Sequence, residues 1–317
     1  MSTRVGAAAA VSALVLIAGS ASAAPLRSAA PTPAEIVFVD VGAGDGVVIR
    51  VGGAVVLSDI GEQNIPFLYK ALDKALAKSG SREIEAVILS HAHDDHVKNL
   101  ALLLQSRQYT VKRVLLSRND HWGATDANRA VMSAIRRFRI PVSYVRTGQT
   151  FGFGGAKWTI LNPSHGAFTK HHQVSNSSVA YALEVNGKRF LFTGDIEKSG
   201  EQAVVAEWQQ LELGPVDLLL ATHHGSKYAS HDFFLDAVKP KSAVISVNLG
   251  HGHPDPEAIQ RMRSAGAAIW CTAWNGSVTA TVPVGATKVR LRSSENSAPW
   301  WLRGERRSRG ACVDQSP

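Results

Sequence analysis

Three histidines and two aspartates lie within six consecutive residues of this chain, His91-Ala92-His93-Asp94-Asp95-His96. The cluster directly follows an apolar run, residues 84–90, that is typical of a buried strand. Neutral imidazole nitrogens and carboxylate oxygens are protein ligands of Zn²⁺ and Mn²⁺. The pattern H-x-H-x-D-H offers more ligands than one ion requires, so it predicts two divalent metal ions, zinc or manganese, at the end of a sheet.

Two further groups of candidate ligands follow apolar runs later in the chain. Asp195 comes just after residues 189–193, and His223 and His224 come after residues 216–221. Taken alone, Asp195 would be interpreted as a turn residue and the histidine pair as a surface or capping feature. Because the first cluster needs partners from other strand ends, we expect all three groups to meet at one edge of a sheet. Two ions about 3.5–4 Å apart activate a water between them, so the pattern predicts hydrolytic chemistry.

The elements that must position these residues follow from hydrophobic periodicity. Hairpin-forming strands come first, with Gly52-Gly53 as a two-residue turn, and strands then alternate with helices, which predicts two β-sheets with helices outside. The glycine-rich segment 42–46 is expected to be a hairpin turn and not a phosphate loop, because a strand follows it. Strands are expected at 35–41, 47–51, 54–57, 84–90, 111–117, 142–145, 158–161, 179–185, 189–193, 216–221, 243–247, 268–272, 277–282 and 288–291, and helices at 66–79, 97–105, 127–139, 200–210, 231–237 and 256–265.

The composition is that of a globular chain of 317 residues, 45% apolar and 19% charged, which can bury a large core. The start of the chain is typical of a secretory signal peptide, with Arg4, an apolar run over 5–18 and small residues at 21–23. The apolar run is shorter than the roughly 20 residues that a membrane span requires. We therefore expect a secreted or periplasmic protein. The expected regions are a signal peptide at 1–23, a flexible leader at 24–34, one domain at 35–284 and a basic tail at 285–317.

Two features of the composition have more than one explanation. The net charge of +8 and the pI near 9.6 favour an anionic partner such as DNA or RNA, but a basic tail kept for solubility accounts for them equally well. Of the two cysteines, Cys271 and Cys312, export permits a disulfide between them, and a buried thiol at Cys271 is the alternative.

Several segments match a known family in the same order along the chain. The sequence resembles the metallo-β-lactamase superfamily and, more narrowly, the hydrolase domain of the bacterial competence protein ComEC and its stand-alone secreted relatives. The resemblance runs from Glu35 to Val284, and it implies an α+β or α/β fold: a four-layer αββα sandwich of two mixed sheets with helices outside. The matching segments are 38–46, 90–96, 191–197, 222–228, 243–247 and 252–254.

The resemblance also implies which residues hold the two ions. In the last motif, His223 follows Thr222 and is expected to be the ligand, while His224 is the alternative and otherwise contacts substrate. Asp59 matches an early aspartate that supports the histidine-rich loop. The remaining implied ligands are His91 and His93 for the first ion, Asp95 and His96 for the second, and Asp195 as a bridge.

One ligand position departs from the family pattern. The superfamily normally supplies a further histidine to the first ion, between the first cluster and Asp195. Here the chain has the polar segment 170–178 instead. His172 would complete the first site, or Asn176 would line it, or both belong to a plain loop; all three interpretations stay open.

The predicted function is an exported metal-dependent hydrolase, and the resemblance favours a phosphodiesterase or nuclease. Asp95 is expected to orient the activated water and accept its proton, and Ser226 to contact the anionic substrate. His253, in the family's Gly-His-Pro motif, or Lys227 would stabilise the developing negative charge; a turn before a helix is the alternative explanation of His253. Hydrolysis of a lactam, lactone or other ester is one alternative function, and a non-catalytic nucleic-acid-binding envelope protein is another.

Overall fold

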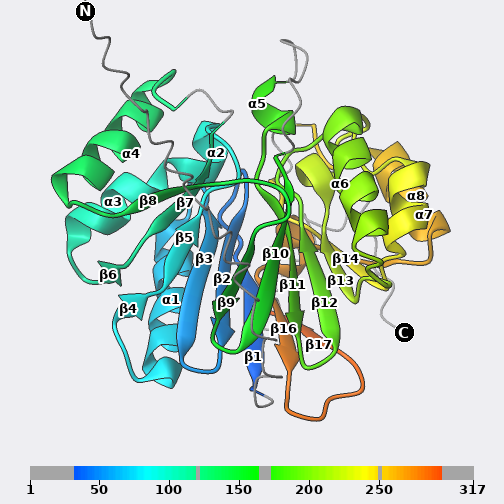
Figure 1. Cartoon of the computed structure of the whole chain (residues 1–317), viewed down its shortest axis with the longest axis horizontal. Coiled ribbons are helices and arrows are strands. Elements are labelled where there is room, and N and C mark those ends of the chain that lie inside the picture. The colour runs from blue at the N-terminus through cyan, green and yellow to red at the C-terminus, as the bar shows by residue number, and fades with distance from the viewer. Residues whose placement is uncertain (1–31, 119–121, 164–172, 249–251, 295–317) are drawn as a thin grey trace, which may run out of the picture.

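The computed structural model describes residues 32–118, 122–163, 173–248 and 252–294 of the chain. These residues form two β-sheets that pack face to face, with helices on both outer sides (Figure 1). The predicted αββα sandwich of mixed sheets is confirmed. No helix within these ranges combines the length and the apolar character that crossing a membrane requires.

The first sheet contains β1 (Ala34–Phe38), β2 (Gly46–Val51), β3 (Ala54–Ile60), β5 (Ala86–Ile88), β7 (Val114–Ser117), β8 (Val142–Val145), β16 (Val278–Val282) and β17 (Arg290–Ser293). Their order across the sheet is β17-β16-β1-β2-β3-β5-β7-β8. Pairing is antiparallel from β17 to β3 and parallel from β3 to β8. Residues 52 and 53 alone separate β2 from β3, as the predicted two-residue turn requires.

The second sheet contains β9 (Thr150–Phe153), β10 (Ala156–Asn162), β11 (Ala180–Val185), β12 (Lys188–Phe192), β13 (Leu218–Leu220), β14 (Ser242–Ile245) and β15 (Ala268–Cys271). It repeats the plan of the first sheet, with an antiparallel half from β9 to β12 and a parallel half from β12 to β15. A separate two-stranded ribbon pairs β4 (Glu83–Ile84) with β6 (Thr110–Val111).

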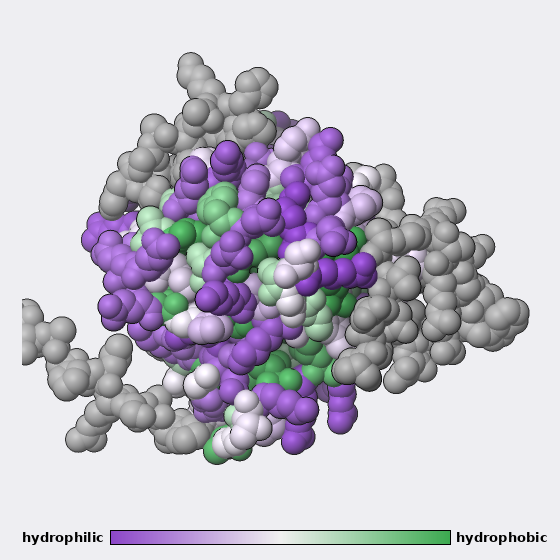
Figure 2. Space-filling model, turned by 90° about the vertical axis from the view of Figure 1, so that its right-hand side faces the viewer, coloured by the Kyte–Doolittle hydropathy of each residue, from purple (hydrophilic) through white to green (hydrophobic). Residues whose placement is uncertain are grey.

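Helices cover the outer face of each sheet. Figure 2 shows the molecule from the side of the second sheet's helices, where the surface is mainly hydrophilic with small apolar patches. The first sheet carries α1 (Ile65–Ser79), α3 (Asn99–Ser106) and α4 (Asp126–Arg137), and the second carries α6 (Lys198–Gln210), α7 (Asp232–Val238) and α8 (Pro256–Ser264). The short helices are α2 (Asp94–Val97), α5 (Gln173–Asn176), α9 (Thr272–Asn275) and the 3₁₀ turn η2 (Thr222–Gly225).

Three buried cores hold the four layers together. The central core lies between the sheets, where Tyr181 stacks on Phe192 with ring centroids 4.7 Å apart. Each outer core lies between a sheet and its helices. Along β2, Val47 and Ile49 face the central core while Val48 faces the outer one. Because both faces of the sheet are buried here, Val47, Val48 and Ile49 form an apolar run with no polar alternation.

Most predicted elements occur close to their expected bounds, and the differences are local. The expected strand at 84–90 is divided between β4 and β5, and the expected helix at 97–105 is preceded by a separate turn, α2. The elements β9, α5 and α9 were not predicted. The four residues of α5 and of α9 span little more than one helical turn, and β9 contains Gly152, which weakens a strand pattern. The signal peptide, most of the leader, His172 and Cys312 lie outside the described residues. Cys271 is buried in the second sheet's outer core. Because Cys312 and the signal peptide lie outside the described residues, the disulfide and export both stay predictions.

The loop between β1 and β2 packs closely against the histidine-rich loop. A Cβ atom at Gly44 would lie 1.8 Å from the backbone oxygen of Asp95, and the φ angle of Gly44 is +80°. On the other side, the Oγ of Ser246 donates a hydrogen bond to the carbonyl oxygen of Gly44 at 2.9 Å. Segment 42–46 therefore connects two strands, as predicted, and also joins loops from both sheets.

We expect Gly44→Ala to lower the free energy of unfolding by more than about 2 kcal/mol. The methyl group adds a steric overlap with the Asp95 backbone to the roughly 1–2 kcal/mol cost of a left-handed backbone. Urea unfolding followed by circular dichroism measures the change. Gly53→Ala is the matched control, because a Cβ there meets nothing within 4 Å. Equal stability of the two variants would contradict the close approach at Gly44.

Candidate metal centre

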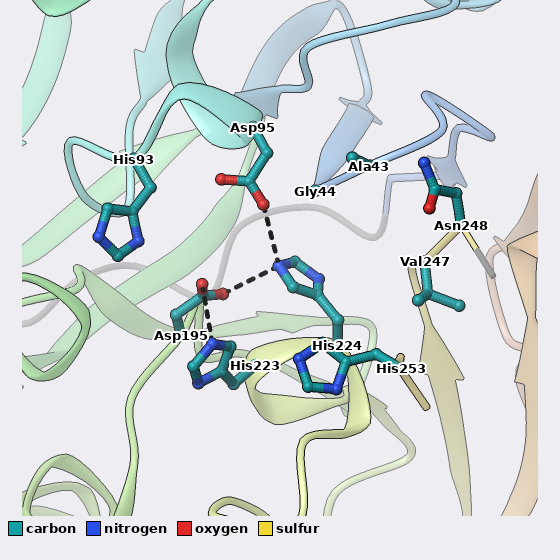
Figure 3. Close-up of a pocket in the computed structure, with 10 residues that line it drawn as sticks. All are labelled: Ala43, Gly44, His93, Asp95, Asp195, His223, His224, Val247, Asn248 and His253. Atoms are coloured by element: carbon teal, nitrogen blue, oxygen red, sulfur yellow. Dashed lines mark ion pairs between the residues drawn. The ribbon is translucent and has the colours of Figure 1, made fainter. Parts of the chain in front are cut away.

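The predicted ligands converge at one end of the sandwich, in loops that follow β5, β12, β13 and β14. Parallel pairing places the carboxyl ends of β12, β13 and β14 at the same edge of the second sheet. The histidine-rich loop after β5 faces them from the first sheet (Figure 3). A cavity of about 190 Å³ lies between the two sets of loops, and its lining includes His93, Asp95, Asp195, His223, His224 and His253.

Asp195 lies at the middle of this arrangement, with 2% of its surface exposed. Its Oδ2 atom is 3.4 Å from Nε2 of His91. Its Oδ1 atom is 3.2 Å from Nε2 of His96 and 3.2 Å from Nε2 of His224. Each oxygen of one carboxylate therefore faces a different set of imidazoles, as a bridging ligand would.

Two groups of ligand atoms share this carboxylate. In the first, Nε2 of His91 lies 2.9 Å from Nδ1 of His93. In the second, Nε2 of His96 lies 3.2 Å from Nε2 of His224, and Oδ2 of Asp95 lies 3.8 Å and 3.6 Å from these two atoms. The first group consists of His91, His93 and Asp195, and the second of Asp95, His96 and His224. Within each group, one ligand atom from each residue lies within 4.8 Å of the others.

Hydrogen bonds on the far side of the rings fix how these histidines point. Nδ1 of His96 is 2.9 Å from Oδ2 of Asp59, whose Oδ1 accepts a hydrogen bond from the backbone N–H of Ser90. Nδ1 of His91 is 2.9 Å from Oγ of Ser90. Nδ1 of His224 donates to the carbonyl oxygen of Ser246 at 2.9 Å. Each Nε2 atom is consequently left to face Asp195, which is how supported metal-ligating histidines are oriented.

Strained backbone accompanies this arrangement. Asp59, His223 and His224 have φ angles of 49°, 49° and 54°, in the left-handed region that residues with side chains seldom occupy. Each such residue costs on the order of 1–3 kcal/mol and persists only where its surroundings require it. All three adjoin the cavity or support its ligands, so the strain coincides with the site.

The charge state differs between the two groups of ligands. Burial disfavours the imidazolium of His224, but the carboxylates of Asp195 and Asp45 together outweigh burial and raise the pKa of His224 to about 9. The pKa of His96 is raised well above its usual value against the same burial, because Asp195, Asp95 and Asp59 surround it. In contrast, burial and the neighbouring His91 lower the pKa of His93 to about 4, and burial lowers that of His91. The histidines of the first group therefore favour the neutral form that binds a cation, whereas His96 and His224 of the second group favour the protonated form.

The donor set fits divalent metal ions. Both carboxylate oxygens of Asp45 are buried without a hydrogen-bond partner among the described residues. Buried carboxylate oxygens are costly unless a cation or a donor satisfies them. Imidazole nitrogen and carboxylate oxygen are ligands that zinc, manganese and iron accept. The arrangement thus has both the geometry and the chemistry of a metal site.

The structure distinguishes the two histidines that follow β13. His224, expected to contact substrate, has its Nε2 among the ligand atoms of the second group. His223, expected to be the ligand, has its Nε2 3.7 Å from Oδ2 of Asp195 and its Nδ1 3.3 Å from Oε1 of Glu197. Both residues have left-handed backbones, and their ring centroids lie 6.1 Å apart with the ring planes at 80° (Figure 3).

The other predicted site residues are divided between the cavity and its surroundings. His253 lines the cavity, with its ring centroid 5.8 Å from that of His223. Lys227 is exposed, and its Nζ lies 5.1 Å from the ring centroid of Tyr228. Ser226 is buried, with its Oγ accepting the backbone N–H of Tyr228. Asn176 caps α6, since its Oδ1 accepts the N–H groups of Glu197 and Gly200.

Asp45 is a site residue that the sequence interpretation missed. It is 1% exposed, and its Oδ1 lies 3.7 Å from Nδ1 of His224. Burial raises the pKa of Asp45 to about 6 despite the nearby histidines. An aspartate inside a glycine-rich turn is usually explained by the turn itself. The position of Asp45 in the first matching segment was the one indication of a further role.

Comparison with known proteins identifies the class. Residues 39–251 match the Metallo-beta-lactamase superfamily, and the chain belongs to that superfamily. Its relatives include ComE operon protein 3 of Bacillus subtilis, 27% identical over 261 residues that make up 77% of this chain and 32% of that protein. Competence protein ComA of Neisseria gonorrhoeae is 25% identical over 288 residues, 88% of this chain and 37% of that protein. The predicted resemblance to the ComEC group is thereby confirmed.

The chain spans about a third of the length of these relatives. Among solved structures, CmlA, a diiron beta-hydroxylase from Streptomyces venezuelae, has a TM-score of 0.50 and 15% identity over 80% of this chain and 54% of that one. At this identity the likeness describes the fold alone.

Metal loading at pH 7 is expected to release protons, about two per chain, because His96 and His224 are protonated in the metal-free protein and bind metal only when neutral. The pKa of His224 is raised, so protons compete with metal below about pH 9 and metal affinity rises with pH up to that value. Calorimetric titration with zinc in two buffers of different ionisation enthalpy measures the release. Heats that do not depend on the buffer would contradict the charge assignment.

Proposed function

We propose that this protein is an exported, metal-dependent phosphodiesterase that cleaves nucleic acid at a centre of two divalent ions. The observation that carries the proposal is the shared carboxylate of Asp195, which presents one oxygen to each group of ligands. Two adjacent ions can clamp the attacking and leaving oxygens of a phosphodiester. The competence-protein relatives and the net charge of +8 support a polyanionic substrate.

We assign His224 to the second ion and give His223 the substrate side of the cavity. The assignment rests on the 3.2 Å separations of His224 Nε2 from both His96 and Asp195. The His223 side chain is 22% exposed at the edge of the cavity, where a phosphate oxygen can reach it. The proposed ligands are His91 and His93 for the first ion, Asp95, His96 and His224 for the second, and Asp195 between them.

The roles of the remaining residues follow from their positions. When bound, the ions supply a water with a pKa of about 7 and offset charge on the phosphate. The Asp95 side chain is 30% exposed, and the surrounding histidines outweigh burial and lower its pKa, so it is ionised and can accept a hydrogen bond that orients a water. His253 lies across the cavity (Figure 3), and burial and His223 lower its pKa. A neutral His253 can donate a hydrogen bond to a phosphate oxygen.

The direct test is hydrolysis of single-stranded DNA and of bis(p-nitrophenyl) phosphate by the full chain. Cleavage is expected to disappear with a chelator and to return with zinc or manganese. Asp195→Ala is expected to lower kcat/KM at least about a thousandfold, because it removes a ligand from both ions.

Asp126→Ala is the matched control for that test, because the Asp126 side chain is 99% exposed. Activity within about twofold of the unchanged protein is expected for this variant. Nitrocefin and a lactone serve as comparison substrates. Metal-dependent hydrolysis of either of these, with no cleavage of the phosphodiesters, would contradict the proposal.

Metal content distinguishes the two adjacent histidines. His224→Ala is expected to retain about one ion per chain, because it removes a ligand of the second ion, whereas His223→Ala is expected to retain about two. Inductively coupled plasma mass spectrometry of the dialysed proteins measures both. The reverse result, with metal lost from His223→Ala alone, would restore His223 as the ligand.

A further inference from the structure

A second cavity opens beside the metal centre, along the first turn of α6. Its volume is about 600 Å³, within the range of roughly 300–1,000 Å³ that binds small molecules. We call it the α6 groove. Its lining includes Asn176, Glu197, Lys198, Gln202, Tyr228 and His231.

The α6 groove adjoins the metal centre through one pair of side chains. Glu197 lines the groove, and its Oε1 lies 3.3 Å from Nδ1 of His223. His223 in turn lines the metal cavity, with its Nε2 3.7 Å from Asp195. A substrate longer than the metal cavity would therefore pass over His223 into the groove.

The groove combines an exposed aromatic ring with cationic side chains. Tyr228 is 59% exposed, although it lies in a well-packed segment next to the site. Nζ of Lys227 lies 5.1 Å from its ring centroid. Lys198, from the first turn of α6, lines the groove wall. An exposed ring with one ammonium group beside it, and a second lysine on the groove wall, suits a ligand that has both flat bases and phosphates.

The backbone that presents Tyr228 is held firmly from two sides. Glu201 of α6 is fully buried and accepts the backbone N–H of Ser230 and, at 2.7 Å, Nδ1 of His231. From α8, Arg261 donates hydrogen bonds of 2.8–2.9 Å to the carbonyl oxygens of Lys227, Ala229 and Ser230. A buried acid and a multidentate arginine thus fix the surface segment that follows His224. Such preorganisation lowers the cost of binding a ligand.

We propose that the α6 groove binds the nucleotides next to the scissile phosphodiester of a single-stranded nucleic acid. A base stacks on Tyr228, and Lys198 and Lys227 contact neighbouring phosphates. Single strands are favoured over duplexes because only unpaired bases present their faces to an aromatic side chain. The proposal rests on the proposed function, since it extends the same substrate beyond the metal cavity.

Binding of a fluorescently labelled oligothymidylate to the full chain tests the groove by anisotropy, with a chelator present so that no cleavage occurs. Tyr228→Ala is expected to raise Kd about tenfold, the loss of one stacked base, and Tyr228→Phe to bind as the unchanged protein does. Lys198→Ala and Lys227→Ala are each expected to reduce the slope of log Kd against log salt by about 0.7.

Tyr144→Ala is the matched control. Tyr144 on β8 is also an exposed tyrosine, at 43%, with Arg118 5.3 Å from its ring centroid, but it lines neither cavity. The Kd of Tyr144→Ala is expected to stay within about twofold of that of the unchanged protein. Three results would each overturn the proposal that the groove binds nucleotides. They are unchanged binding by Tyr228→Ala, equal losses of affinity in Tyr228→Ala and Tyr144→Ala, and no binding by the unchanged protein. Cleavage of bis(p-nitrophenyl) phosphate, which is too small to need the groove, decides the phosphodiesterase proposal separately.

Discussion

The buried carboxylate of Asp195 is the constraint on which the rest of the site depends. Removed from water, it must be matched by positive charge, and four imidazoles from two loops surround it. They outweigh burial and hold the pKa of Asp195 well below its usual range. The same negative charge keeps protons on His96 and His224. A divalent ion at this position would replace those protons as the charge that balances the Asp195 carboxylate.

The sandwich supplies this arrangement through its topology. Each sheet has a parallel half, and the carboxyl ends of those strands deliver the ligand loops to a common edge. The antiparallel halves build the central core that fixes the spacing of the sheets. Gly44 then allows the loop after β1 to touch both Asp95 and Ser246. Placement of the site therefore depends on packing that lies far from the ligands in sequence.

Rigidity around the centre is concentrated where substrate would be handled. Left-handed backbones at Asp59, His223 and His224 are tolerated because side-chain hydrogen bonds and core packing hold the turns. The segment after His224 is fixed in a similar way by Glu201 and Arg261, although the side chains of Lys227 and Tyr228 face solvent. Together these contacts form one continuous, preorganised surface from the metal cavity to Tyr228.

The sequence by itself determined the layers, most of the strands and helices, and the convergence of His91, His93, Asp95, His96 and Asp195. These follow from periodicity and from the rule that ligands lie at strand ends, which are local or topological properties. Only the tertiary structure decided that Nε2 of His224 lies 3.2 Å from both His96 and Asp195 while His223 also reaches Glu197. It also decided that Asn176 caps α6, and that Asp45 enters the site while Lys227 stays at the surface. The direction of a side chain in a turn depends on backbone dihedral angles, and those are set by distant packing partners that no local pattern records.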